Sequence, residues 1–205
     1  ECLAQGEGFV KVTGEVGLGK TLLCRRLLQA IEKDYVMAYV PNPSLSPHEL
    51  RCAIARELGV RPVKSEEALQ TRLVNKLVSL HKAGKRVVLI IDEAQHLEPE
   101  VLEQLRLLTN LETNTKKLLQ VILIGQPELQ QLLKRRDLRQ LAQRITARYH
   151  LLPLNKQELA AYIKHRLSVA DCHRALFNDG ALTAIHQISQ GIPRLVNLVC
   201  HSALM

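Results

Sequence analysis

Short apolar runs alternate along the chain with longer segments in which apolar residues recur every three or four positions. The apolar runs predict buried strands, and they lie at Phe9–Thr13, Tyr35–Val40, Arg86–Glu93 (whose last two residues are acids), Leu118–Ile124 and Tyr149–Leu152. The segments between them predict amphipathic helices. Strands that alternate with helices indicate a doubly wound α/β fold, in which ligands bind at the carboxyl ends of parallel strands.

Capping signals mark the ends of several helices. Ser46, Pro47 and Glu49 supply an N-cap, a first-turn proline and a capping-box acid for a helix that runs to Leu58. Further helices are predicted from Lys20 onward and on residues 65–84, 98–112 and 127–134. We therefore predict a five-stranded parallel sheet flanked by helices.

The strand pattern stops at Asn155. Asn155 and Glu158 form a capping box for a helix that ends near Ala170, a second helix is predicted on residues 179–190, and a third begins at Pro193. The expected organisation is an α/β domain over residues 1–153 and a small all-helical C-terminal lid over residues 154–205. We expect the lid to be truncated and the chain to start just short of its functional loop.

The segment Gly14–Thr21 has the pattern G-x-x-x-x-G-K-[ST] between a predicted strand and a predicted helix, as a phosphate-binding loop requires. Backbone N–H groups of such a loop and the positive end of the following helix attract phosphate. Lys20 would reach the outer phosphates of a nucleotide bound to the α/β domain, and the Thr21 hydroxyl would bind Mg²⁺. The predicted cofactor-binding residues are Gly14, Glu15, Val16, Gly17, Leu18, Gly19, Lys20, Thr21 and Leu22.

Two acids at the end of the third predicted strand supply the remaining groups for hydrolysis. Asp92 would hold Mg²⁺ through its water shell, and Glu93 would orient and deprotonate the attacking water. Gln126 follows the next strand, where its amide would hydrogen-bond the water or the γ-phosphate. The other interpretation is that Gln126, which precedes a proline, only caps the next helix.

Composition limits the class of protein. The chain has 205 residues, of which 46% are apolar and 3% aromatic, so it can bury one substantial aliphatic core. No apolar run approaches the roughly 20 residues of a membrane helix, so any membrane link would be peripheral or outside this segment. Five widely spaced cysteines without a C-x-x-C pair indicate neither a disulfide framework nor a zinc site, and fit a reducing cytoplasm.

The net charge of +8 fits nucleic acid, an acidic membrane face or an acidic partner equally well, and the segment Lys134–Arg148 holds six basic residues and one acid. This segment is open to three interpretations: a solvated basic face, a nucleic-acid groove, or a subunit interface that presents an arginine to the neighbour's nucleotide. No aromatic residues lie among its arginines, which argues against a surface on which the bases of single-stranded nucleic acid stack. The phosphates of duplex nucleic acid are still a possible partner. Arg194 follows Gly191-Ile192-Pro193 in the first turn of a helix, where a cation favours an anionic partner such as the γ-phosphate.

The order of these motifs, from the phosphate loop through Asp92-Glu93 and Gln126 to Gly191–Arg194, resembles that of AAA+ ATPases over essentially the whole chain. This resemblance implies that Arg194 is the lid arginine called sensor 2. It also implies that Arg144 is the arginine finger, which acts on a neighbouring subunit, with Arg148 and Arg139 as other candidates.

More narrowly, three segments resemble the ExeA/GspA group of type II secretion, namely Gly8–Gly17, Asp92–Leu97 and Ile124–Leu129. Two others, Leu22–Arg25 and Tyr39–Pro43, are similar to ATPases of MSHA type IV pilus biogenesis. The resemblance implies a Mg²⁺-dependent ATPase that self-associates as a dimer or ring. It would be cytoplasmic or peripheral at the inner membrane, where it would energise assembly by pilus or secretion proteins. Two alternatives are a DNA-associated AAA+ regulator of transposition, which shares Asp-Glu-Ala-Gln, and a scaffold that binds ATP but scarcely hydrolyses it.

Overall fold

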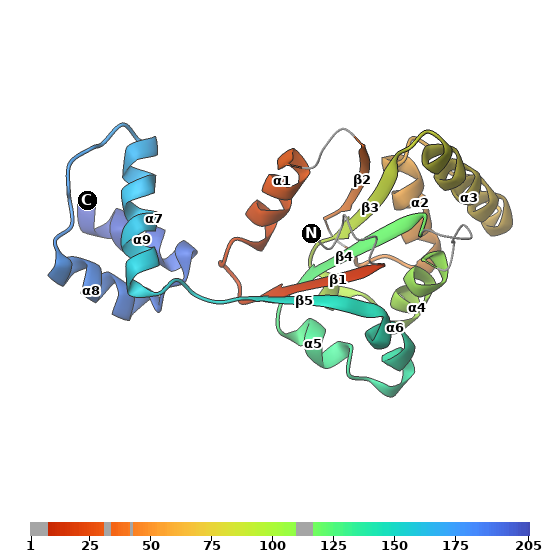
Figure 1. Cartoon of the computed structure of the whole chain (residues 1–205). Helices are drawn as coiled ribbons and strands as arrows, with labels where there is room; N and C mark the ends of the chain where they lie inside the picture. The colour runs from red at the N-terminus through yellow and green to blue at the C-terminus, as the bar shows by residue number, and fades with distance from the viewer. Residues whose placement is uncertain (1–7, 31–33, 42, 110–116) are drawn as a thin grey trace. The chain divides into compact units, whose positions relative to one another are not determined.

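The computed structural model describes residues 8–30, 34–41, 43–109 and 117–205, and the chain divides into two compact units (Figure 1). The first unit comprises the chain up to Gly14 together with Lys20–His150. The second comprises Leu151–Met205 together with the short segment Glu15–Gly19. The division at Leu151 lies slightly before the boundary expected after residue 153, and Glu15–Gly19 groups with the helical unit.

The first unit is built on a parallel sheet with the strand order β2-β3-β4-β1-β5. Its strands are β1 (Phe9–Gly14), β2 (Tyr35–Val40), β3 (Arg86–Ile91), β4 (Leu119–Gly125) and β5 (Ile145–Leu151). Ile91 of β3 pairs with Leu123 of β4, and Thr13 of β1 pairs with Gly125. This register brings the carboxyl ends of β1, β3 and β4 to one edge and confirms the predicted five-stranded parallel sheet.

The edge strand β5 begins earlier than its sequence suggested. It was expected at Tyr149–Leu152 but starts at Ile145, so part of the basic segment is strand. Ile145 and Ala147 are buried, whereas Thr146 and Arg148 between them are exposed, which is the alternation of a strand with one covered face. The polar residues of this alternation hid the strand from a search for continuous apolar runs.

The helices of the first unit are α1 (Lys20–Ala30), α2 (Pro47–Glu57), α3 (Glu66–Lys82), α4 (Pro99–Leu108), α5 (Glu128–Leu132) and α6 (Arg139–Arg144). They lie close to their predicted positions, except α6, which falls in the basic segment and was not predicted. The capping box of Ser46 and Glu49 is present at α2. α4 ends at Leu108, and residues 110–112 of the helix predicted there lie outside the described residues.

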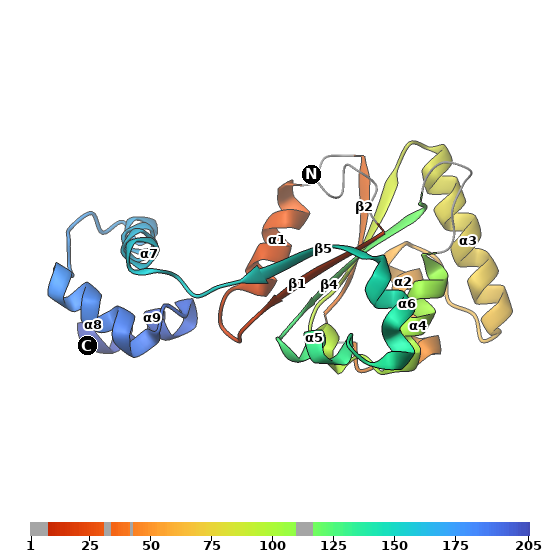
Figure 2. The ribbon, with the colours of Figure 1, turned by 60° about the horizontal axis from the view of Figure 1, so that its bottom comes forward.

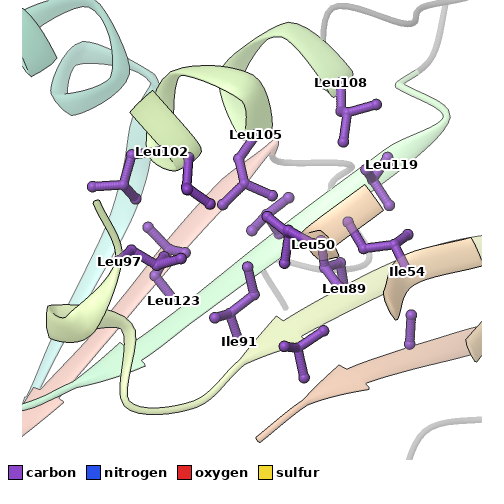
Figure 3. Packing of buried hydrophobic residues seen from close by; sticks show 14 of the residues in the cluster. Leu50, Ile54, Leu89, Ile91, Leu97, Leu102, Leu105, Leu108, Leu119 and Leu123 are labelled. Carbon is purple, nitrogen blue, oxygen red and sulfur yellow. The ribbon is translucent and has the colours of Figure 1, made fainter. Parts of the chain in front are cut away.

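Leucine and isoleucine side chains from the sheet and from α2 and α4 form the main core (Figure 3). Leu89 and Ile91 of β3 face Leu50 of α2, while Leu102 and Leu105 of α4 pack above β4. Figure 2 shows α1 on the opposite side of the sheet from α4, α5 and α6. The sheet is therefore covered on both faces, and the carboxyl ends of its strands are the part of it that remains available to a ligand.

The second unit carries the predicted lid helices α7 (Lys156–Val169), α8 (Asp179–Ser189) and α9 (Pro193–Leu204) around a small core of its own. The capping box of Asn155 and Glu158 is present at α7. Gly191 has a φ of 73°, and a Cβ at this position would collide with the carbonyl oxygen of Leu154. Glycine is therefore required where the chain turns into α9.

Candidate functional site

The loop between β1 and α1 turns on two glycines with positive φ. Gly17 and Gly19 have φ values of 87° and 90°, which side chains disfavour. The Leu18 N–H donates to the Glu15 carbonyl at 3.4 Å, and α1 begins directly afterwards at Lys20. The glycines of the predicted phosphate loop therefore provide the tight turn that their spacing suggested, while the side chains of Val16 and of Leu22 in α1 are exposed.

Lys20 is buried at the start of α1, with 6% of its surface exposed. Its Nζ donates to the carbonyl oxygen of Gly14 at 2.7 Å. The lysine therefore reaches back to the residue at which β1 ends, and its ammonium lies beside the amino end of a helix. Both features favour an anion at this position.

Asp92 follows β3 and is almost completely buried, with 3% of its surface exposed. Its Oδ2 accepts hydrogen bonds from Thr21 Oγ1 at 2.9 Å and from the Tyr39 hydroxyl at 3.2 Å, and its Oδ1 accepts from the Glu93 N–H at 2.9 Å. The structure thus brings together the two residues that were predicted to bind Mg²⁺. Tyr39 was not among the predicted site residues, and only its place at the end of the neighbouring strand could have suggested it.

The negative charge of Asp92 also changes its neighbours. Burial, with a further contribution from Asp92, raises the pKa of the Tyr39 hydroxyl to about 12. Burial and Asp92 likewise raise the pKa of the Cys24 thiol in α1 to about 12. Both groups therefore stay protonated at neutral pH. Tyr39 acts as a hydrogen-bond donor, and Cys24 is a buried and unreactive thiol.

Glu93 has the left-handed backbone conformation, with a φ of 52°. Its Oε2 accepts hydrogen bonds from Gln95 Nε2 at 2.6 Å and from Gln126 Nε2 at 3.2 Å. The hydrogen bond from Gln95 is the main cause of a pKa below the usual glutamate value, helped by Gln126 and by the charge of Lys20 and opposed by burial. Glu93 is therefore ionised at neutral pH and able to accept a proton from water.

Gln95 connects Glu93 to the end of β4. Its Oε1 accepts from the Gln126 N–H at 3.0 Å, and a Cβ on Gly125 would lie 2.8 Å from the same oxygen. Gln126 makes no side-chain cap on α5, whose N-cap is Pro127. Its amide is instead directed at Glu93. Gln95 was missed as a site residue because a glutamine four positions beyond the end of β3 carries no periodic signal.

The predicted arginines lie in different places. Arg194 is exposed in the first turn of α9 in the second unit, and its N–H donates to the Gly17 carbonyl at 3.3 Å within that unit. Arg144 is half-buried at the end of α6 and donates from Nη1 to the Arg106 carbonyl at 3.3 Å. Arg148 donates from Nη2 to the Ala142 carbonyl at 3.0 Å, and Arg139 is exposed.

The donor set at the end of β3 fits Mg²⁺ bound together with a nucleotide. Across residues 8–30, 34–41, 43–109 and 117–205, no cluster of at least three His, Cys, Asp or Glu side chains could hold a metal ion alone. Mg²⁺ needs only one or two protein oxygens when phosphates and water complete its shell, and Thr21 and Asp92 offer these 2.9 Å apart. Cys24, Cys52, Cys172 and Cys200 are free thiols, and no described helix is long and apolar enough to span a membrane.

A glycine turn precedes a buried lysine at the start of a helix, and the threonine after this lysine donates a hydrogen bond to an aspartate at the end of β3. These features define a P-loop nucleoside triphosphatase site. A family model described as "AAA domain" matches residues 3–133, so the chain belongs to the AAA domain family. The chain is 54% identical to General secretion pathway protein A of Aeromonas hydrophila over 99% of its own length and 38% of that relative. The predicted similarity to the ExeA/GspA group is confirmed.

Two further comparisons are more distant. The ATP-dependent target DNA activator B of Escherichia phage Mu is 31% identical over 50% of this chain and 31% of that protein. The ORC2 protein of Aeropyrum pernix superposes with a TM-score of 0.70 and 17% identity over 97% of this chain and 56% of that one. The latter similarity confirms the predicted AAA+ fold. The chain spans between about a third and two fifths of the length of its curated relatives.

The hydrogen bond from Gln95 to Glu93 predicts a measurable change in titration. Replacing Gln95 with alanine removes the main cause of the lowered pKa, so the pKa of Glu93 should rise toward the ordinary glutamate value. A pH titration of the ¹³C-labelled glutamate carboxyls by NMR measures this directly. Gln70→Ala, on the exposed face of α3, is the matched control and should leave Glu93 unchanged. If the pKa of Glu93 in Gln95→Ala equalled that of the wild type, the hydrogen bond from Gln95 would not be what lowers it.

Proposed function

We propose that this chain binds ATP with Mg²⁺ and hydrolyses the terminal phosphoanhydride bond. The observation that carries this proposal is the contact of Asp92 with Thr21 beside a Glu93 that is hydrogen-bonded as a carboxylate. A site that only bound nucleotide would need Lys20 and Thr21. It would have no use for an ionised base at the end of β3, which is why a scaffold that scarcely hydrolyses ATP is less favoured.

Lys20 and Asp92 prepare the site for the phosphates. The Lys20 ammonium, now bonded to the Gly14 carbonyl, would exchange this acceptor for the outer phosphate oxygens, whose charge offers a stronger hydrogen bond. Thr21 and Asp92 would hold Mg²⁺, directly and through water. The metal would neutralise charge on the phosphates.

Glu93 and its two glutamines act on the attacking water. Glu93 would accept the proton of this water, and the amides of Gln95 and Gln126 hold its carboxylate in one orientation. Gln126 would also sense the γ-phosphate, because turning its amide from Glu93 toward a phosphate oxygen exchanges one anionic acceptor for another. Nucleotide state would in this way alter the basicity of Glu93.

We further propose that the chain works in a self-associated state. Arg194 would contact the γ-phosphate as sensor 2, a role supported by the cost of placing a cation in the first turn of α9 without an anion. Arg144 would act on a neighbouring subunit's nucleotide, with Arg148 and Arg139 as the other candidates. An arginine supplied in trans stabilises the charge of the transition state and makes hydrolysis depend on assembly.

The cellular role proposed for the chain is to energise assembly of an envelope machine, either a type II secretion system or an MSHA-like type IV pilus, through inner-membrane proteins of that machine. The 54% identity to General secretion pathway protein A supports the secretion role. We place the ATPase in the cytoplasm, peripheral to the inner membrane. A DNA-associated role of the transposition type is the second candidate, supported by 31% identity over half of the chain to the phage Mu activator.

Two substitutions in the full chain test the proposed hydrolysis. Lys20→Ala should weaken ATP binding by about tenfold to a hundredfold, because a charge-assisted hydrogen bond to phosphate is lost. Glu93→Gln should bind ATP with nearly unchanged affinity but turn over about 10² to 10⁴ times more slowly, because the base is lost. Calorimetry measures the affinity, and phosphate release measures the turnover.

The control for these variants is Glu67→Gln, which alters an exposed glutamate of α3 and should behave as the wild type. Wild-type turnover in Glu93→Gln would contradict the proposed mechanism. Duplex DNA added to the wild type tests the second candidate. Strong stimulation that falls with salt would favour the DNA role, whereas a rate that rises with protein concentration and ignores DNA would favour self-assembly.

Mixing two inactive variants tests the arginine in trans. Arg144→Ala retains its own ATP site, and Lys20→Ala retains its arginine, so an equal mixture should recover part of the activity that each protein alone lacks. The same mixture is made with Arg139→Ala and Arg148→Ala, and the steady-state ATPase rate is the readout. Recovery by one of the three identifies the finger. Failure of all three to recover with Lys20→Ala would contradict the trans mechanism.

A further inference from the structure

A cavity of about 310 Å³ lies in the first unit between β1, β5, α5 and α6. Its basic lining residues are Lys11, Lys134, Arg148 and His150, and none of its lining residues is acidic. It shares no residue with the proposed nucleotide site at Lys20, Thr21, Asp92, Glu93 and Gln126. Apart from Arg148, one candidate for the arginine in trans, the proposed hydrolysis gives the residues of this cavity no role.

Lys11 is the unusual member of this group. It lies in the middle of β1, opposite Leu123 of β4, and only 8% of its surface is exposed. Burial, and then the charges of Arg148 and Lys134, lower the pKa of its amine. Within the described part of the chain no side chain or carbonyl forms a hydrogen bond or ion pair with its ammonium.

The Lys11 side chain is almost wholly covered, and its amine lines the cavity beside Arg148 and Lys134, where like charges repel one another and no acid compensates them. A structural role would be served by an apolar side chain, as at the neighbouring β1 positions Val10 and Val12. An anion bound in the cavity would instead be attracted by Lys11 and by the cations that surround it.

We propose that this cavity binds a small phosphate-bearing anion through Lys11, Lys134 and Arg148. A guanidinium and two ammonium groups suit a phosphate, since arginine presents a planar fork and lysine a compact point charge. The Arg148 guanidinium is oriented by its bond to the Ala142 carbonyl at 3.0 Å. Thr13 Oγ1 and His150 Nδ1, 3.0 Å apart, add hydrogen-bonding groups at the wall.

Size and depth favour a small anion over a nucleic acid. Lys11 lies in the lining of the cavity with 8% of its surface exposed, whereas the backbone of a rigid duplex contacts exposed charges along an extended surface. A cavity of about 310 Å³ is larger than one phosphate needs, and Leu133 and Ile145 in its lining offer apolar contact. The occupant is therefore either a free phosphate anion or a phosphate ester with a small organic body.

The experiment uses the full chain with Lys20→Ala, which should weaken binding of phosphate groups at the proposed phosphate loop. Inorganic phosphate, glycerol 3-phosphate and duplex DNA are titrated into this protein by calorimetry. At least one of the two small anions should bind saturably. Lys11→Met in the same background should weaken that binding about tenfold or more, because a charged hydrogen bond is lost. Lys134→Gln, at an exposed position that should not affect folding, should also weaken it.

The control Lys64→Met removes an equal charge from an exposed position outside the cavity and should change the affinity less than about twofold. A second readout is the titration of the Lys11 side chain by ¹³C NMR after labelling, in which the bound anion should raise the Lys11 pKa. Similar affinity for both anions would indicate that the cavity binds free phosphate. Tighter binding of glycerol 3-phosphate would indicate that it binds a phosphate ester and contacts its organic part. No saturable binding, binding of DNA alone, or binding that Lys11→Met leaves unchanged would overturn the proposal.

Discussion

The buried carboxylate of Asp92 is the interaction on which the site depends. It accepts hydrogen bonds from Thr21 in α1, from Tyr39 at the end of β2 and from the backbone of Glu93. A carboxylate with 3% exposure is tolerated only when such donors replace its water. One charge therefore holds together a helix and two strands, and it does so at the edge where the parallel strands end.

This constraint also accounts for the backbone of Glu93. The left-handed conformation at φ 52° costs about 1–3 kcal/mol for a residue other than glycine. It allows the Glu93 N–H to bond Asp92, while the Glu93 side chain meets Gln95 and Gln126. A metal-binding acid and a proton-accepting acid can thus be adjacent in sequence and still have different surroundings. The first is buried among donors, and the second is partly exposed and held by two amides.

The sequence was sufficient to predict those strands, helices and loops that depend on hydrophobic periodicity and on the spacing of motif residues. Continuous apolar runs such as Val87–Ile91, capping boxes such as Ser46 and Glu49, and the glycine pattern of the loop each have one common structural outcome. β5 was predicted too short because it lies at an edge and alternates polar with apolar residues. Tyr39 and Gln95 could not be assigned to the site, because their roles depend on strand register and side-chain direction.

The basic segment illustrates the same limit. Sequence alone left its five arginines and its one lysine open to three interpretations: a solvated face, a nucleic-acid groove or a subunit interface. The fold instead divides them among α6, the exposed side of β5 and a cavity that also contains Lys11 from β1. Lys11 lies far from this segment in the sequence, and nothing in its immediate neighbours marks it as buried beside other cations.

The measurement that tests the central claim most directly is the effect of Mg²⁺ on ATP affinity in the wild type and in Asp92→Asn. If Asp92 and Thr21 hold the metal, Mg²⁺ should tighten ATP binding to the wild type and to the exposed control Asp171→Asn by about tenfold or more, and should have little effect on Asp92→Asn. Calorimetric titrations in Mg²⁺ and in EDTA provide the comparison, with thermal unfolding as a check that Asp92→Asn is folded. A folded Asp92→Asn protein that responds to Mg²⁺ as strongly as the wild type would contradict the account.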